Sequence, residues 1–485
     1  MFDGGFALEL PFLEGIVGSV NDVIWTYIVI GLLIIAGLYF TIRTNFVQVR
    51  MFPEMFRVIT EKRNSDTGVS AFQAFTISAA ARVGTGNITG VALAITVGGP
   101  GAVFWMWAIA TVGMATGFIE STLGQLYKEK DGDRYRGGPA YYIQKALGLR
   151  WLSILFVILI VLCFGMIFNA LQVNTITDSF QTAFDTNRLL LSLILAAITS
   201  IIIFGGVKRI VKVTQLMVPF MAVAYMAVAL FIVFVNLDQI PAVISLIFNE
   251  AFGISQAVGG GFGAAIMEGA RRGLFSNEAG MGSVPNAAAA ANVTHPVKQG
   301  LFQSLGVFFD TMIICSCTAF IILLSTGYMN VEGEGATVTQ FAMSQHIGEW
   351  ASAFVAIAIL FFAYSSVLGN YYYGETNIEF LKNGARWLPI YRVAFLIMGV
   401  LGGIATVELV WTMADLFMAL MAIVNITVIL LLTKKAVTLL KDYTKQRKAG
   451  KDPVFYASQY PEIKNTECWG DNEDERTRHV PFTSW

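Results

Sequence analysis

A glycine-rich run inside an apolar part of the chain, Val83-Gly84-Thr85-Gly86-Asn87, has the chemistry to bind ions. Glycine costs a helix interior about 1 kcal/mol relative to alanine, so a helix over residues 70–95 is expected to break here. A break within a bilayer leaves carbonyl oxygens on one side, which suit a cation, and N–H groups on the other, which suit a carboxylate. Thr85 and Asn87 add side-chain oxygens. The run therefore predicts a site for a zwitterion that binds together with a cation.

The composition of the whole chain places this site in a membrane. Hydrophobic residues make up 55% of the 485 residues and charged residues 13%, whereas a soluble domain carries about 25% charged residues. The net charge of -1 carries no signature of nucleic-acid binding. Four cysteines are too few for a disulfide framework and are expected to be small core residues. The sequence thus predicts an all-α polytopic membrane protein.

Apolar runs of about 20 residues mark the candidate membrane spans. They predict eleven spans, near residues 22–42, 70–95, 99–127, 151–180, 189–206, 213–235, 255–290, 298–327, 350–375, 390–406 and 408–433.

Lysine and arginine are concentrated in every second loop. They gather within 43–63, 128–150, 208–212, 382–392 and the tail 434–485, and are nearly absent from the alternate loops. By the positive-inside rule, the N-terminus is expected outside the cell and the C-terminus in the cytoplasm, which requires an odd number of spans. The tail from Lys434 is expected to be a solvated cytoplasmic extension, with a basic membrane-surface helix over 434–448 as the alternative.

The second and seventh spans are both too glycine-rich to be plain helices, and they lie five spans apart. Paired interrupted segments in corresponding positions indicate a transporter with an inverted repeat. The predicted parts are an outer N-terminus (1–21), an extra first span with its loop (22–69), a first repeat (70–235) and a second repeat (236–433) before the tail. The alternative is that the glycines only allow close helix packing.

The seventh span contains four glycines between residues 259 and 263, where its break is expected. Glu268 would lie beside that break, either reaching the site or pairing with Arg271 at i+3. Arg271 and Arg272 are expected at the cytoplasmic interface. Ser276-Asn277-Glu278 is expected to cap a short helix that begins there.

Four blocks of the sequence resemble the alanine/glycine:cation symporter family, also called sodium:alanine symporters. The similarity extends from about residue 20 to 440. The blocks are Val83–Asn87, Gly98–Trp107 (GGPGAVFWMW), Arg272–Gly280 (RGLFSNEAG) and Phe361–Glu375 (FFAYSSVLGNYYYGE). The resemblance implies a LeuT-like five-plus-five inverted repeat over spans 2–6 and 7–11. It also implies inward transport of a small neutral amino acid coupled to Na⁺, with H⁺ as an alternative.

The resemblance also assigns roles to individual residues. It implies a Na⁺ site formed by the carbonyls of Ala80 and Val83 with the hydroxyls of Ser365 and Ser366, and oxygen ligands suit this hard cation. Back-bonding to the helix is the alternative for the two serines. The substrate residues that it implies are Thr85, Gly86, Asn87, Gln172, Gly263, Ile266 and Asn370.

Asn370 departs from the family pattern, because several members have tryptophan there. An amide in place of an aromatic lid should leave a larger, more polar pocket, so glutamine is a candidate substrate beside alanine and glycine. Arg82 lies next to the cation site and should repel it unless paired, and Glu120 and Asp310 are its candidate partners.

Other classes of function fit the sequence less well. A channel should show filter loops or charged rings, and an enzyme should show a catalytic cluster, whereas the three histidines are scattered over loops and tail. No nucleotide-binding run is present, so an ion gradient must drive transport. No cofactor is expected beyond the coupling ion, no enzyme activity is expected, and the oligomeric state stays open.

Overall fold

The computed structural model describes residues 11–59, 68–253, 261–331, 333–381 and 384–470. Apolar helices dominate these residues, and their hydrophobic side chains pack into two large clusters and a small third one. Within the described ranges, eight helices are long and apolar enough to cross a membrane: Glu14–Arg43, Ala102–Leu126, Arg150–Phe184, Val207–Val235, Pro296–Leu323, Trp350–Phe380, Arg386–Ile404 and Val407–Lys448. The chain is therefore a multi-pass membrane protein, as its composition predicts.

The N-terminal part is one long helix followed by short ones. Its elements are α1 (Pro11–Ile24), the π-helical segment η1 (Trp25–Val29), α2 (Ile30–Arg43), α3 (Val47–Arg50) and α4 (Phe52–Ile59).

The second predicted span is interrupted where its glycines indicated. Helix α5 (Ala71–Arg82) begins at a capping box, in which the Ser70 hydroxyl accepts from the Gln73 N–H at 3.1 Å. It ends before Val83 and Gly84, and the chain continues as the π-helical η2 (Gly86–Gly90) and α6 (Val91–Gly98). The predicted break is confirmed.

Uninterrupted spans follow, with a small hairpin among them. The elements are α7 (Ala102–Leu126), strands β1 (Glu129–Asp131) and β2 (Arg134–Arg136), α8 (Pro139–Tyr142), η3 (Ile143–Leu147), α9 (Arg150–Leu162), η4 (Cys163–Phe168), α10 (Asn169–Phe184), α11 (Arg188–Ile203), α12 (Val207–Val235) and α13 (Ile240–Ala251). The two strands pair antiparallel, with Lys130 opposite Tyr135.

The seventh predicted span is also interrupted, but at a different place from the one expected. Helix α14 (Gly261–Asn277) runs without a break through Gly263, Ile266 and Glu268, and α15 (Val284–Ala290) follows. Residues 259 and 260 lie outside the described part. The break falls at Glu278–Ser283, where Glu278, Gly280 and Gly282 adopt positive φ angles of 57°, 100° and 82°. The prediction that Ser276–Glu278 starts a helix is wrong, because α14 ends there.

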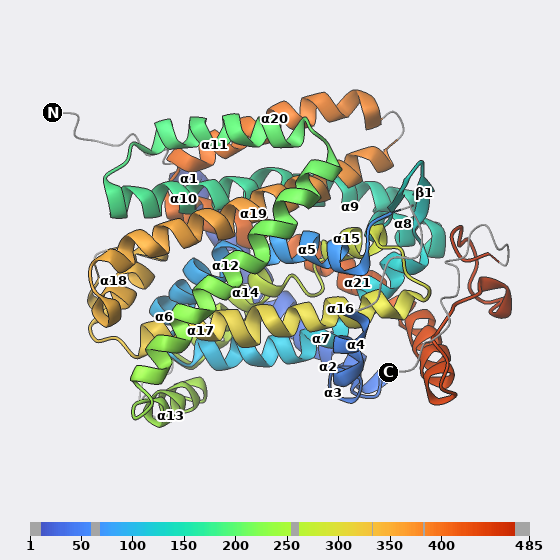
Figure 1. The fold of residues 1–485 in the computed structure, drawn as a ribbon, viewed down its shortest axis with the longest axis horizontal. Helices are drawn as coiled ribbons and strands as arrows, with labels where there is room; N and C mark the ends of the chain where they lie inside the picture. Colours follow the sequence, from blue (N-terminus) through green and yellow to red (C-terminus); the bar gives the residue numbers. More distant parts are fainter. Residues whose placement is uncertain (1–10, 60–67, 254–260, 332, 382–383, 471–485) are drawn as a thin grey trace.

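The remaining elements complete the bundle. They are α16 (Pro296–Val307), the π-helical η5 (Phe308–Cys315), α17 (Ser316–Leu323), the 3₁₀ turn η6 (Tyr328–Asn330), α18 (Ala336–Ile347), α19 (Trp350–Phe380), α20 (Gly384–Ile404), α21 (Val407–Lys448) and the 3₁₀ turn η7 (Ala457–Gln459). Figure 1 shows α13 and α18 at one end of the bundle, and β1 and α8 at the opposite end, beside the C-terminal part of the chain.

The described part of the tail packs against the helix bundle instead of extending into solvent. Phe455, Ile463 and Trp469 are buried. The Trp469 indole N–H donates to the carbonyls of Gln125 and Leu126, at 3.2 and 3.1 Å, where α7 ends. The solvated extension expected from the tail's polar composition is therefore corrected as far as residue 470.

Lys128 connects the end of α7 to this tail. Its ammonium lies over the rings of Tyr135 and Trp469, 4.1 and 4.9 Å from their centroids, and donates to the Ala291 carbonyl at 2.9 Å. Burial lowers the pKa of Lys128 to about 8, because the charged form loses its water.

Candidate functional site

The break in the second span releases three backbone carbonyls. The Gly84 N–H donates to the Asn87 side-chain oxygen at 2.9 Å, and the Asn87 N–H donates to the Gly84 carbonyl at 3.2 Å. The Thr85 N–H donates to the Gln172 side-chain oxygen at 3.2 Å. In a regular helix these three donors would bond the carbonyls of Ala80, Val83 and Ala81. These carbonyls are therefore free of their helical donors.

Two serines of α19 face the released carbonyls. The Ser366 hydroxyl donates to the Ala80 carbonyl at 2.9 Å, and the Ser365 hydroxyl lies 3.4 Å from the same oxygen. Both serines are fully buried. They also bond the Phe362 carbonyl, at 2.8 Å from Ser365 and 3.2 Å from Ser366, which is the back-bonding alternative. Three of the four residues predicted to bind the cation thus have oxygens close together, and Val83 lies in the adjoining turn.

On the other side of the break, Gln172 of α10 caps the start of η2. Its side-chain oxygen also accepts from the Thr85 hydroxyl, at 2.5 Å. Both side chains are buried. An amide oxygen held by an N–H and a hydroxyl at the positive end of a helix occupies a position that would suit a carboxylate oxygen.

Gly84 and Gly86 allow other elements to approach the break closely. A Cβ on Gly84 would overlap the Ser366 hydroxyl and lie 3.2 Å from the Gln172 side-chain oxygen. A Cβ on Gly86 would lie 2.8 Å from the Phe275 ring. These two positions need glycine because α10, α14 and α19 all meet the break there.

A polar cluster that the sequence did not single out lies next to Asn87. The Asn87 amide donates to the Asp310 carboxylate at 2.7 Å and to the Ser276 hydroxyl at 3.1 Å. The Ser276 and Thr311 hydroxyls donate to the same carboxylate at 2.6 and 3.0 Å. Cys315 completes the cluster, with its sulfur 3.1 Å from the Ser276 hydroxyl. Ser276 lies in the Arg272–Gly280 block that resembles the family. That position was the only sign in the sequence that Ser276 could belong to the site.

Glu120 of α7 holds the second break open. Its two carboxylate oxygens accept from the Gly280 and Gly282 N–H groups, each at 3.2 Å, and from the Asn425 amide at 2.8 Å. The carboxylate thus satisfies donors that the interrupted helix leaves without partners. The residues at both breaks are buried.

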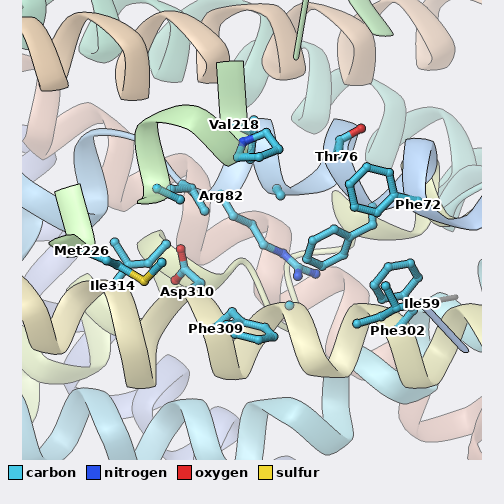
Figure 2. Close-up of a pocket in the computed structure, with 16 residues that line it drawn as sticks. Ile59, Phe72, Thr76, Arg82, Val218, Met226, Phe302, Phe309, Asp310 and Ile314 are labelled. Carbon is cyan, nitrogen blue, oxygen red and sulfur yellow. The ribbon is translucent and has the colours of Figure 1, made fainter. Parts of the chain in front are cut away.

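Arg82 reaches a cavity from the end of α5. Its guanidinium donates to the Gln303 carbonyl at 3.2 Å, and its other two nitrogens have no hydrogen-bond partner in the described part of the chain. The predicted ion pairs to Glu120 and Asp310 are absent among the described residues. Figure 2 shows Arg82 and Asp310 in this cavity, which has a volume of about 240 Å³ and also borders Val83. The cavity therefore reaches the first break.

An aromatic and ionic layer covers the opposite side of the break. The Phe275 ring lies 4.8 Å from the rings of both Phe168 and Trp411. Beyond them, Arg272 pairs with Asp415 at 2.9 Å and with Glu268 at 3.0 Å. These side chains close the path from the break toward the beginning of α21.

The arginines of α14 do not lie where the sequence predicted. Arg271 pairs with Glu268 at 3.3 Å, as predicted, and with Asp22 at 3.5 Å. Asp22 lies about 30 Å from the Arg43 end of its helix, at 1.5 Å per residue. Arg271 and Arg272 are therefore near the N-terminal end of that helix, and their placement at the interface beside the tail is corrected.

The other predicted substrate residues separate into two groups. Asn370 follows Ser366 by one helical turn on the same face of α19, is 1% exposed, and has no hydrogen-bond partner for either amide atom in the described chain. Gly263 and Ile266 lie about 20 and 15 Å along α14 from Ser276, at 1.5 Å per residue. Because the break is not beside them, their assignment to the substrate site loses its basis.

The chain is similar to known proteins over most of its length. The sequence profile of the sodium:alanine symporter family matches residues 10–457. The chain is 57% identical to the amino-acid carrier protein AlsT of Bacillus subtilis, covering 96% of this chain and 99% of that protein. It is 54% identical to the probable sodium/glutamine symporter GlnT of the same organism, covering 96% and 98%.

A more distant relative and a solved structure extend these matches. The sodium/alanine symporter AgcS of Methanococcus maripaludis is 37% identical, covering 89% of this chain and 98% of that protein. Among solved structures, a manganese transporter from Eremococcus coleocola superposes with a TM-score of 0.52 at 14% identity, covering 81% of this chain and 92% of that one. This last likeness concerns the fold alone.

Proposed function

The chain belongs to the sodium:alanine symporter family, and we propose that it carries a small neutral amino acid across the membrane together with Na⁺. The observation that carries this proposal is the pairing of two chemistries at one break. Released carbonyls and two serine hydroxyls lie on one side, and a helix N-terminus held by Gln172 lies on the other. The first suits a hard cation and the second a carboxylate.

The proposed architecture has eleven spans with an inverted repeat of five plus five. The order of elements supports it. After the broken α5–α6 come α7, the short α8, then α9–α10, α11 and α12. After the broken α14–α15 come α16–α17, the short α18, then α19, α20 and α21. The short helices α8 and α18 lie toward opposite ends of the bundle, as an inversion requires (Figure 1). We propose the N-terminus outside the cell and the C-terminus in the cytoplasm.

In the proposed site, Na⁺ binds to the carbonyl oxygens of Ala80 and Val83 and to the hydroxyls of Ser365 and Ser366. Sodium would replace the hydrogen bonds that the two hydroxyls now donate to Ala80, so that all four groups present oxygen to the ion. The substrate carboxylate would replace the Gln172 oxygen at Thr85, with Gly86 and Asn87 beside it. Gln172 would then turn its amide toward the bound amino acid.

We propose that glutamine is a substrate beside alanine. The Asn370 amide is buried, lacks partners in the described chain, and lies on the face of α19 that meets the break. A buried polar group without a partner costs about 1–3 kcal/mol, and a polar substrate side chain would remove that cost. The similarity to a probable sodium/glutamine symporter agrees with this choice.

The transport cycle requires each side of the site to open in turn. The layer of Phe275, Trp411 and the Arg272–Asp415 pair closes the side toward the beginning of α21. The cavity at Arg82 reaches the break from between α5, α12 and α16. We propose that this conformation is closed to the outside.

Proton coupling is the second candidate, and Asp310 is the residue that favours it. Its carboxylate is fully buried beside Asn87 and has no ion-pair partner among the described residues. Protonation would be the simplest way to neutralise it. In that case an inward pH gradient would drive uptake in place of sodium.

Uptake into proteoliposomes tests the proposal. Labelled alanine and glutamine would be supplied with an inward Na⁺ gradient, with K⁺ in place of Na⁺, and with a pH gradient alone. Accumulation above equilibrium that requires Na⁺ supports sodium symport. Accumulation driven only by the pH gradient would identify H⁺ as the coupling ion. Absence of uptake for both amino acids would overturn the substrate assignment.

A further inference from the structure

A basic groove lies far from the broken helices, where α2 ends and α21 completes its last turns. It has a volume of about 430 Å³. Its lining includes five cationic side chains and no aspartate or glutamate: Arg43, Arg50, Lys441, Lys445 and Lys448. Nothing in the proposed transport cycle uses this groove.

The groove is built from two parts of the chain that are far apart in sequence. Lys441, Lys445 and Lys448 are spaced i, i+4 and i+7, so they share one face of α21. Arg43 and Arg50 lie on the opposite wall. They are brought there by a tight turn in which Asn45 and Phe46 take positive φ angles of 54° and 53°. The tertiary fold, and not a local run of charge, therefore assembles the five cations.

These cations differ from those on the other faces of the same helix. Arg447 pairs with Glu54 at 3.0 Å, and Lys435 donates to the Tyr127 hydroxyl at 2.8 Å. None of the five groove cations has an ion pair among the described residues. Cations spaced i, i+4 repel one another, so an anion bound between them would relieve this repulsion.

Exposed apolar side chains adjoin the basic groove. Ile42, Phe46 and Val49 are 66%, 53% and 68% exposed, and Ile42 and Val49 directly precede Arg43 and Arg50 in the sequence. Ile42 lies in the last turn of a helix long and apolar enough to cross the bilayer, and Phe46 and Val49 follow that helix directly. A ligand for this surface would therefore combine an anionic group with hydrocarbon, at the height of a membrane interface.

We propose that this groove binds the headgroup of an anionic phospholipid, with the phosphodiester among the five cations and an acyl chain along Ile42, Phe46 and Val49. A free phosphate has the same charge but offers nothing to the apolar side chains. A zwitterionic phospholipid has the chains, but its cationic group would meet five positive charges.

Thermal unfolding of the full-length protein in detergent, with added phosphatidylglycerol, tests the proposal. Phosphatidylcholine and inorganic phosphate are the two comparison ligands. The test variant is K441Q/K445Q/K448Q. The matched control is K130Q/K451Q/K464Q, which removes the same charge from three exposed lysines outside the groove. A third variant, K441R/K445R/K448R, keeps the charge in the groove.

We expect phosphatidylglycerol to raise the unfolding temperature of the wild type, the control and the arginine variant. Each basic residue near an anionic surface strengthens binding about fivefold, so removing three should weaken it on the order of 100-fold. The test variant should therefore need far more lipid for the same shift.

Three results would overturn the proposal. The test variant could retain the wild-type response to phosphatidylglycerol, or the control could lose it equally. Phosphatidylcholine or inorganic phosphate could produce the same shift in the wild type. If K441Q/K445Q/K448Q unfolds before lipid is added, the result with K441R/K445R/K448R decides between the outcomes. Loss of the phosphatidylglycerol response in that arginine variant would contradict a site built on charge.

Discussion

The side-chain oxygen of Gln172 accepts hydrogen bonds from both the N–H and the hydroxyl of Thr85, at 3.2 and 2.5 Å. It therefore occupies the position in which the proposed substrate places a carboxylate oxygen. Gln172 belongs to an uninterrupted helix and Thr85 to a broken one. The contact is thus the point at which the substrate would exchange one partner for another.

Gln172→Glu should abolish uptake. A carboxylate at this position would compete for the same donors and repel the substrate, at about 4 kcal/mol for charges 4 Å apart at an effective dielectric constant of 20. We expect alanine uptake to fall at least about 100-fold, while Gln172→Ala should raise KM only about tenfold. Initial rates in proteoliposomes, normalised to folded protein, measure both. Wild-type rates in the glutamate variant would contradict the assignment.

Ser366→Ala should weaken sodium dependence more than Ser365→Ala does. The Ser366 hydroxyl lies 2.9 Å from the Ala80 carbonyl, and the Ser365 hydroxyl 3.4 Å. Loss of one oxygen ligand to a charged group costs about 1.5–3 kcal/mol. The Na⁺ concentration for half-maximal uptake should therefore rise about tenfold or more in Ser366→Ala. The reverse order of the two variants would argue that Ser366 only back-bonds to its helix.

Gly84→Ala should stop transport while leaving the protein folded. The added Cβ would overlap the Ser366 hydroxyl and crowd the Gln172 oxygen, so both sides of the break would have to move. Gly263→Ala is the matched control, because a Cβ there meets no atom of the described residues within 4 Å. Uptake should be lost in the first variant and unchanged in the second. Loss of transport in Gly263→Ala would restore the sequence-based placement of the second break.

Asn370→Leu should change substrate preference. The variant removes the buried amide and keeps a side chain of similar volume, so alanine uptake should persist. Competition by glutamine should weaken about tenfold, the effect of one lost hydrogen bond. Inhibition of labelled alanine uptake by increasing glutamine measures the change. Equal inhibition of wild type and variant by glutamine would show that Asn370 does not determine substrate specificity.

Arg272→Ala should destabilise the protein more than Asp415→Asn. Arg272 pairs with both Asp415 and Glu268, so its removal takes an ion-pair partner from two buried carboxylates and leaves them only the longer contacts to Arg271, at 4.0 and 3.3 Å. Breaking a buried pair costs about 3–5 kcal/mol. The asparagine variant leaves the Arg272–Glu268 pair in place. Thermal unfolding in detergent should rank them accordingly. Equal stability of the two would mean that Glu268 contributes nothing to the pair.

The first break could be predicted from the sequence because its cause is local. Gly84 and Gly86 weaken the helix, and Asn87 supplies the acceptor that its freed N–H groups need. The pairing of Glu268 with Arg271 could also be predicted, since residues three apart on a helix are neighbours.

The second break could not be placed, because what opens it comes from elsewhere in the chain. Gly261 and Gly263, the described glycines of the expected break, lie within α14. The helix ends where Glu120, over 150 residues earlier, accepts from the Gly280 and Gly282 N–H groups. The polar cluster of Asn87, Ser276 and Asp310 was missed for the same reason, since it joins three elements distant in sequence.

The packing of Phe455 and Trp469 against the bundle has a consequence for how the protein is made. These residues leave the ribosome after all the described membrane helices have been synthesised. Nevertheless, the Phe455 N–H donates to the Thr294 carbonyl just before α16, and the Trp469 indole donates to the last carbonyls of α7. The surface at this end of the bundle is therefore completed only after α21 has been synthesised. A truncation or fusion point placed before Trp469 would remove the residues that cover the end of α7.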